Sequence, residues 1–380
     1  MASLVLHTPL CDLLGIRYPV LLAGMGTLRG RPTPPRLVAA VSNAGGLGVM
    51  GATALSPEEI RQRIREVRTL TDKPFGVDLL LPASLAEAGP VRITTRSQAM
   101  SWIQQEYPRH YAFVQSLMQE LGLPAVEHAH EEPLRTERVR QQVQVVLEEK
   151  VPVFAAGLGD PAWVVPLARE AGVKVIGLAG SVRNALRQKK AGVDIIVAQG
   201  YEAGGHTGRI ATFPLVPQVV DAVAPTPVLA AGGIADGRGV AAALALGAQG
   251  VWVGTAFLVA LESDLYPPMQ EAILKASSED FVVSRSYSGK TARTLKNPIT
   301  EAWERSGLEP LPMPLQGLLM SDLLEAAERA GRYELLFNAA GQIGGILKER
   351  KPAAQIMDDL VRGAIEVLER LPTKVTFAIA

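Results

Sequence analysis

The sequence predicts an α/β fold in which eight parallel strands close into a (β/α)₈ barrel. Three observations support this class: short apolar runs recur along the chain, most are apolar throughout rather than alternating, and helical stretches separate many of them. Continuous apolar character is typical of parallel strands buried on both faces. Strand–helix alternation implies right-handed βαβ units, and eight such units favour a closed barrel over an open doubly wound sheet. The predicted strands are Val20–Ala23, Leu47–Met50, Phe75–Leu80, Val151–Ala156, Val173–Leu178, Val193–Val197, Val228–Ala231 and Val251–Val253.

The helices between these strands have recognisable ends. Ser56 followed by Pro57 is typical of a helix start, because serine caps the first turn and proline suits the first helical position. Three helices stop at a glycine, and the next strand begins within a few residues. The predicted helices are 34–44, one opening at Ser56, 161–171, 181–191 with Ser181 as its N-cap, and 237–246.

Two segments interrupt the short strand–helix rhythm. A helical insertion after the third strand covers residues 82 to about 150, with helical patterns around Thr95–Leu121 and Glu137–Lys150. A mainly helical extension after the eighth strand covers residues 258–348, and the amphipathic helix Ala353–Leu371 follows it. Insertions after barrel strands lie at the face where active sites form, so both are candidate lids. An oligomer interface, such as a homodimer contact, is an equally open role.

The bounds of the insertion and the extension predict how the chain divides into domains. Residues 1–257 and 349–380 form a TIM barrel that carries the insertion, and the last helix completes its wall. Residues 258–348 form a substrate-covering extension.

Composition excludes several classes of partner. Lys+Arg and Asp+Glu both number 38, so the formal net charge is zero and no basic surplus suggests nucleic acid. Cys11 is the only cysteine, which rules out an internal disulfide and a multi-cysteine metal site. The chain has neither a signal-peptide pattern nor an apolar stretch long enough for a bilayer. We therefore expect a cytoplasmic protein without membrane or nucleic-acid partners.

Two glycine turns have the composition of a phosphate site. Ala231-Gly232-Gly233 follows the seventh strand, and Gly254-Thr255 follows the eighth. In barrels the loops at these two places commonly bind phosphate, through backbone N–H groups and a nearby helix N-terminus. The chain lacks a G-x-G-x-x-G fingerprint in a strand–helix context. These turns therefore predict the phosphate of a mononucleotide-type cofactor rather than that of a dinucleotide.

A histidine lies in a glycine-rich loop after the sixth strand. His206 is one of five histidines in the chain, and Gly204 and Gly205 before it allow close approach of backbone to a ligand. Its position at the carboxyl end of a barrel strand predicts a catalytic role, against the alternative of a surface histidine. Glu202 either orients this imidazole or stands as a carboxylate on the rim.

These segments resemble a known family. Ala198–Gly208, together with Ala230–Ile234 and Val253–Leu258, resembles the nitronate monooxygenases, formerly called 2-nitropropane dioxygenases. That family comprises FMN-dependent barrel enzymes related to flavin-dependent enoyl-acyl-carrier-protein reductases. The resemblance runs from Thr8 through the eighth strand and resumes in Ser288–Arg293 and Ala340–Gly344.

The resemblance implies a set of site residues. His206 matches the family's active-site histidine, and the backbone at Gly24, Met25 and Gly26 would lie against the isoalloxazine ring of FMN. Asp78 stands where the family often has asparagine, so it would contact the ribityl chain or the ring, or remain protonated. No metal ligand is implied. The remaining residues implied in FMN binding are Gln199, Gly204 and Gly205 in the histidine loop, and Ala231, Gly232, Gly233, Gly254 and Thr255 around the phosphate.

The resemblance also implies a reaction. Alkyl nitronates would be oxidised by molecular oxygen to a carbonyl compound and nitrite, with His206 binding the nitro oxygens or removing an α-proton. The alternative is an NAD(P)H-dependent flavin oxidoreductase acting on a quinone, an enoyl thioester or an acyl-CoA-like substrate. Lys290, Arg293 and Lys296 would then either meet a nucleotide phosphate or form a solvated basic turn. A flavin-binding protein without turnover is a third possibility.

Two further groups of residues have open roles. His128 and His130 suggest either a metal site or a charged loop, and the charged loop is the prediction. The aromatic residues of the insertion either line a substrate tunnel or form the core of the insertion itself; they are Trp102, Tyr107, Tyr111 and Phe113.

Overall fold

The computed structural model, which describes residues 5–26, 32–81, 95–126 and 136–374, confirms the predicted barrel. Eight parallel strands are hydrogen-bonded in the order β1-β9-β8-β6-β5-β4-β3-β2. A bridge between Leu21 and Leu47 joins β1 to the residue before β2, so the sheet closes on itself. The strands are β1 (Val20–Leu22), β2 (Gly48–Gly51), β3 (Phe75–Leu81), β4 (Val153–Gly159), β5 (Lys174–Ala179), β6 (Ile195–Gln199), β8 (Val228–Ala231) and β9 (Gly250–Val253).

Alternate residues of each strand face the barrel interior and the surrounding helices. On β3, Val77 and Leu79 pack outward with the side chains of the helices. Leu21, Ile176 and Trp252 on other strands belong to the interior cluster. Because the period of a strand is two residues, Asp78 between Val77 and Leu79 faces inward. The short helix α1 (Pro9–Leu14) packs below this interior cluster, through Leu10, Cys11 and Leu14.

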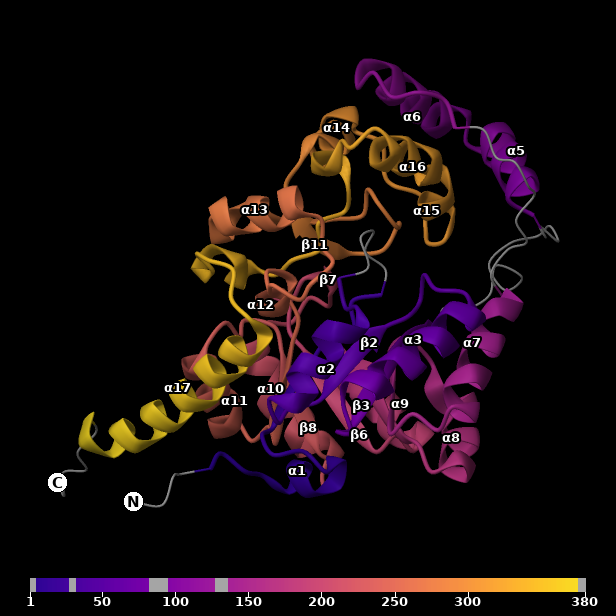
Figure 1. Cartoon of the computed structure of the whole chain (residues 1–380). Coiled ribbons are helices and arrows are strands. Elements are labelled where there is room, and N and C mark those ends of the chain that lie inside the picture. The colour runs from indigo at the N-terminus through magenta and orange to yellow at the C-terminus, as the bar shows by residue number, and fades with distance from the viewer. Residues whose placement is uncertain (1–4, 27–31, 82–94, 127–135, 375–380) are drawn as a thin grey trace.

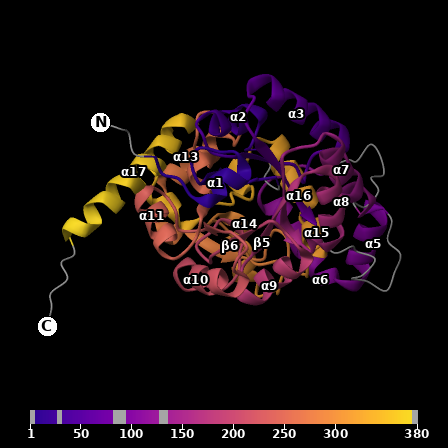
Figure 2. The same cartoon turned by 90° about the horizontal axis from the view of Figure 1, so that it is seen from below.

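A ring of helices surrounds the strands, as the view from below shows (Figure 2). α17 contacts both α11 and α2 and so completes the wall, as the sequence predicted. α7, which the sequence analysis grouped with the insertion, contacts α3, α8 and β3 and is the wall helix between β3 and β4. The wall helices are α2 (Pro35–Asn43), α3 (Pro57–Leu70), α7 (Thr136–Glu148), α8 (Val165–Ala171), α9 (Val182–Ala191), α10 (Thr212–Val223), α11 (Gly237–Ala245) and α17 (Ala353–Lys374).

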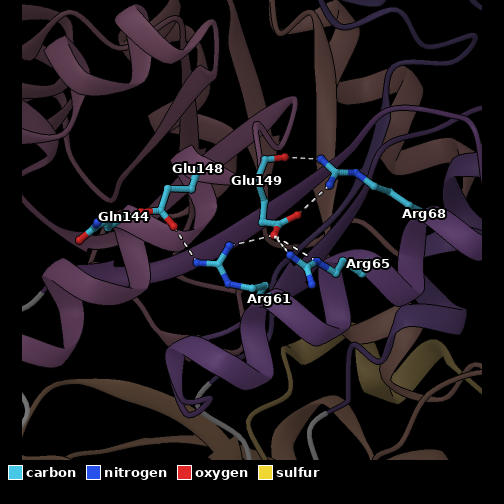
Figure 3. Close-up of polar contacts among 6 residues, drawn as sticks. All are labelled: Arg61, Arg65, Arg68, Gln144, Glu148 and Glu149. Carbon is cyan, nitrogen blue, oxygen red and sulfur yellow. Dashed lines mark hydrogen bonds and ion pairs between the residues drawn. The ribbon is translucent and has the colours of Figure 1, made fainter.

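A salt-bridge cluster fastens α7 to α3 (Figure 3). The Glu149 carboxylate accepts hydrogen bonds from Arg61 at 2.9 Å, Arg65 at 3.0 Å and Arg68 at 2.9 Å. Arg61 also binds Glu148 at 2.6 Å. Burial disfavours the charge of Glu149 most, but the hydrogen bonds from Arg61 and Arg65 help to leave its pKa lowered overall.

A second body, which we name the cap, lies over the carboxyl ends of the strands (Figure 1). It consists of α5 (Arg96–Glu106), α6 (Pro108–Glu120) and residues 258–348, and it has its own apolar core. Arg96 donates to Ser321 at 2.7 Å and pairs with Asp322, which joins the insertion to the extension. The other cap elements are α12 (Thr255–Leu258), which leads into it, α13 (Pro267–Lys275), β10 (Phe281–Ser284), β11 (Ala292–Leu295), α14 (Pro298–Ser306), α15 (Leu315–Leu319) and α16 (Ser321–Arg329).

The cap differs from the prediction in two ways. The single helical pattern at Thr95–Leu121 is two helices, because the backbone leaves the helix at Tyr107 and Pro108 starts the next one. The extension contains β10 and β11, which form a three-stranded sheet with β7 (Gly205–His206) in the order β10-β11-β7. Across the described residues, no helix is both long and apolar enough to cross a membrane.

The aromatic residues of the insertion belong to the core of the cap. Phe113 packs edge-to-face on Trp303 at 5.0 Å, and Trp102 does so on Tyr107 at 5.6 Å. Together with Tyr111 they pack against the cap's apolar cluster and are absent from the walls of the pocket described below. Of the two roles left open, the structure supports the core.

Candidate active site

A pocket opens at the carboxyl ends of the barrel strands, under the cap. Its empty space, including open solvent at the mouth, is about 950 Å³, at the upper end of the range for small-molecule sites. Twelve of the thirteen predicted site residues line it. The exception is Gly26, where a Cβ would lie 2.7 Å from the backbone nitrogen of Ala52, so Gly26 packs on the end of β2. The predicted residues that line the pocket are Gly24, Met25, Asp78, Gln199, Gly204, Gly205, His206, Ala231, Gly232, Gly233, Gly254 and Thr255.

The two glycine turns line this pocket and have backbone N–H groups that the barrel ladder does not use. Gly232 and Gly233 have φ values of 93° and 75°, in the left-handed region that favours glycine. Within the described residues, the N–H groups of Gly232, Gly233, Gly254 and Thr255 have no backbone acceptor. The hydroxyl oxygen of Thr255 accepts from the N–H of Gly341 at 2.9 Å, which ties the cap to this turn. Such unpaired N–H groups suit an anion.

His206 is positioned by the small sheet that joins barrel and cap. It lies opposite Ala292 in the pairing of β7 with β11. Its Nε2 is 2.9 Å from the hydroxyl of Ser288, and its carbonyl accepts from the side chain of Gln199 at 2.6 Å. Ser288 thus holds the imidazole ring, and Gln199 holds the backbone of the same residue.

Burial keeps His206 neutral. Desolvation, with a smaller contribution from the positive charge of Lys290, lowers the pKa of His206 to about 4. Burial also lowers the pKa of Lys290. No carboxylate among the described residues pairs with Lys290. The pocket wall therefore carries a neutral imidazole, and the positive charge of Lys290, which does not itself line the pocket, acts on it from nearby. This electrostatic environment suits an anionic ligand.

The nearby charged residues serve the scaffold. Glu202 accepts from the N–H and the hydroxyl of Thr212, both at 2.9 Å, and so caps α10 rather than orienting His206. Arg293 is 2% exposed, and its guanidinium donates to the carbonyls of Tyr201 and Phe281 at 2.9 and 2.5 Å. Both roles proposed for Arg293, a phosphate contact and a solvated turn, are wrong because these carbonyls take its donors.

The other predicted polar groups lie away from the pocket. Lys296 pairs with Glu301 at 3.2 Å and does not line the pocket. His128 and His130 fall outside the described residues. Within the described ranges, no group of three or more His, Cys, Asp or Glu side chains could hold a metal ion.

Several residues in and around the pocket were not predicted from the sequence. Leu80 and Gly157 line the wall next to Asp78, and Leu80 could have been found from the two-residue period of β3. Ser288 and Gly341 come from the extension, and only the pairing of β7 with β11 and the contacts of the cap bring them to the site. No spacing in the sequence indicates that contact.

The pocket fits a phosphate-bearing planar cofactor. A Cβ at Gly204 would lie 2.6 Å from the backbone of Ala340, so the loop and the cap are already in close contact there. The unpaired N–H groups of Gly232, Gly233, Gly254 and Thr255, which we name the cradle, offer donors to a phosphate. On the opposite wall the buried Oδ1 of Asp78 finds no hydrogen-bond partner among the described residues, which suits a polar group on a ligand.

Fold and pocket thus define a barrel enzyme with an anion cradle and a buried neutral histidine. The family model for nitronate monooxygenase matches residues 7–363. A protein of Staphylococcus aureus named probable nitronate monooxygenase is 34% identical over 95% of this chain and 98% of its own length. A protein of Mycobacterium tuberculosis named as a monooxygenase is 39% identical over 96% of this chain and 98% of its own.

Solved structures agree with these sequence relatives. The nitroalkane oxidase of Streptomyces ansochromogenes has a TM-score of 0.80 and 28% identity, covering 95% of this chain and 99% of its own. FabK of Thermotoga maritima has a TM-score of 0.75 and 34% identity, covering 97% and 100%. The chain belongs to the nitronate monooxygenase family. It is a flavin-dependent oxidoreductase.

Proposed function

We propose that the protein binds FMN and oxidises alkyl nitronates with molecular oxygen to a carbonyl compound and nitrite. The buried His206 on the pocket wall, with the positive charge of Lys290 acting on it, carries this proposal. A nitronate suits this site because it is an anion whose α-carbon has already lost its proton. An imidazole with a pKa of about 4 is a weak base, so the site suits a nitronate better than a neutral nitroalkane.

The glycine turns support FMN as the flavin. Gly232, Gly233, Gly254 and Thr255 line the pocket with N–H groups that have no backbone acceptor among the described residues, and a terminal phosphate would need such donors. Bound FMN would take electrons from the substrate and deliver them to oxygen.

The residues of this chain would bind and orient the substrate. Lys290 attracts the anion, and an anion close to His206 raises the pKa of the imidazole, which strengthens a hydrogen bond to a nitro oxygen. Ser288 fixes the ring through Nε2, and Gln199 fixes the backbone of the same residue. Ala339, Gly341 and Ile343 of the cap line the pocket, so the cap would form part of the wall around a bound substrate.

Anaerobic reduction of the bound flavin tests the proposal. The purified protein is mixed with propionate 3-nitronate, 2-nitropropane nitronate or NAD(P)H while the flavin absorbance is followed. We expect bleaching by a nitronate and not by NAD(P)H, and in air the release of nitrite with the carbonyl compound. The protein-bound flavin is identified by mass after denaturation. A protein that takes up no flavin contradicts the proposal at its first step.

A second candidate is an NAD(P)H-dependent flavin oxidoreductase acting on a quinone, an enoyl thioester or an acyl-CoA-like substrate. It is favoured by the 34% identity to Thermotoga maritima FabK over its full length. Bleaching by NAD(P)H alone would support this candidate. Absence of reduction by every donor would leave a flavin-binding protein without turnover.

A further inference from the structure

Asp78 is a buried carboxyl in the pocket wall that the proposed reaction does not use. Its side chain comes from the middle of β3 and is 6% exposed. Oδ1 has no hydrogen-bond partner in the described parts of the chain. Native proteins seldom leave a buried polar atom unsatisfied, so this atom indicates a ligand group within reach.

Two glycines make room for the carboxyl and leave it facing the pocket. A Cβ on Gly24 would lie 2.2 Å from the Cβ of Asp78, and a Cβ on Gly157 would lie 3.0 Å from its Oδ1. Either substitution would force Asp78 to move. The outward packing of Val77 and Leu79 fixes the inward direction of the side chain between them.

Among the residues that the structure describes, no charge compensates an ionised Asp78. β2, β4 and the segment 23–26, which pack around it, contain no charged residue. The other titratable groups on the pocket wall are Glu202, whose carboxylate is bound by Thr212, and His206, and neither shifts the pKa of Asp78. Burial raises that pKa to about 8, against the opposing hydrogen bond from the Gly157 N–H. Near pH 7 the carboxyl therefore holds a proton.

We propose that Asp78 is a neutral carboxylic acid that donates a hydrogen bond to the bound flavin, so that its ionisation weakens cofactor binding. The inference rests on the flavin of the proposed function and not on its substrate. Asparagine can donate at every pH, whereas aspartic acid donates only while protonated. The aspartate thus makes flavin affinity depend on pH where asparagine would not.

Flavin release measures this dependence directly. The wild-type holoenzyme and Asp78→Asn are diluted at a series of pH values from about 6 to about 9, and release is followed by flavin fluorescence. With a pKa of about 8, the wild-type affinity falls about tenfold by one unit above that value. Asp78→Asn keeps a constant affinity. Titration of the flavin itself is common to both proteins and cancels in the comparison.

A control variant and an infrared measurement show whether Asp78 or another group causes the pH dependence of flavin release. His206→Asn removes the other neutral titratable group of the pocket and retains the wild-type pH profile of release. Infrared spectra of the wild-type protein at neutral pH show the carbonyl band of a protonated carboxylic acid, and Asp78→Asn lacks this band.

Each result of these experiments either supports or overturns the role of Asp78. Parallel pH profiles for the wild type and Asp78→Asn, or the same infrared spectrum for both, overturn the inference. Failure to bind FMN or FAD overturns it together with the proposed cofactor. The predicted profile in a protein that does not oxidise nitronates supports the inference and rejects only the substrate.

Discussion

At the scale of single residues, the reactivity of the site depends on how His206 is held. Its backbone carbonyl is bound by Gln199, so the loop keeps its place when the ring is changed. His206→Asn should slow nitronate turnover about a hundredfold, because the hydrogen bond that orients the nitro group is lost while the flavin stays bound. Steady-state rates check the loss of turnover, and the flavin spectrum of the purified variant checks that the flavin is retained. Near-normal rates with full flavin content would remove the histidine from the mechanism.

Lys290 should determine the preference for an anion. Its positive charge helps to hold the pKa of His206 near 4, so the imidazole is neutral above that pH and charged below it. Lys290→Met should raise the pKa of His206 toward 6.5, because one opposing charge is lost. It should also raise KM for a nitronate severalfold with a smaller change in kcat. Rates measured against pH and substrate concentration separate these effects.

Lys296→Met is the matched control for that variant. Lys296 pairs with Glu301 at 3.2 Å and does not contribute to the pKa shift of His206, whereas Lys290 does. It should leave KM and the pH profile unchanged. Equal effects of the two variants would show that only the overall charge of the cap matters.

At the scale of elements, the sequence predicts the barrel strands well, and the observed ends differ by three residues at most. Strands buried on both faces must be apolar throughout, so each one is visible in the sequence as a continuous run of apolar residues. The cradle at Gly232 and Gly254 was predictable for a related reason, since tight turns after strands need glycine.

The cap was less predictable because its contacts join residues that are far apart in the sequence. The segments that pair are also only a few residues long. β7 has two residues, so no alternation marks it, yet it carries His206. Its partner β11 lies more than eighty residues later. Arg293 looks like a surface charge in the sequence and becomes buried only because three strands meet around it.

The junction of α3 and α7 yields a test at the same scale (Figure 3). Glu149→Ala leaves Arg65 and Arg68 without their carboxylate, and it should lower the melting temperature by about 2–4 °C, less at high salt. Glu148→Ala, which removes one exposed contact with Arg61, is the matched control and should change stability less. Thermal melts at two salt concentrations decide the matter. A larger fall in melting temperature for Glu148→Ala would mean that Glu149 is not the main contact between α3 and α7.

At the scale of the whole molecule, two apolar cores meet at the pocket. The barrel core holds the cofactor cradle, and the separate cap core supports β11 and thereby His206. Met25, on the pocket wall, packs against both cores. The division predicts that the cap can lose order while the cradle remains intact.

Leu323 on α16 is fully buried in the cap core, whereas Leu229 on β8 is fully buried in the barrel. Leu323→Ala should cost about 2–5 kcal/mol, felt first as local opening of the cap. We expect faster hydrogen exchange in α13–α16 and β11, slower turnover, and unchanged flavin content. Leu229→Ala, the control, should speed exchange in barrel and cap together and release flavin. Uniform loss of protection in Leu323→Ala would mean that both cores unfold as one cooperative unit, and the cap could not move independently of the cradle.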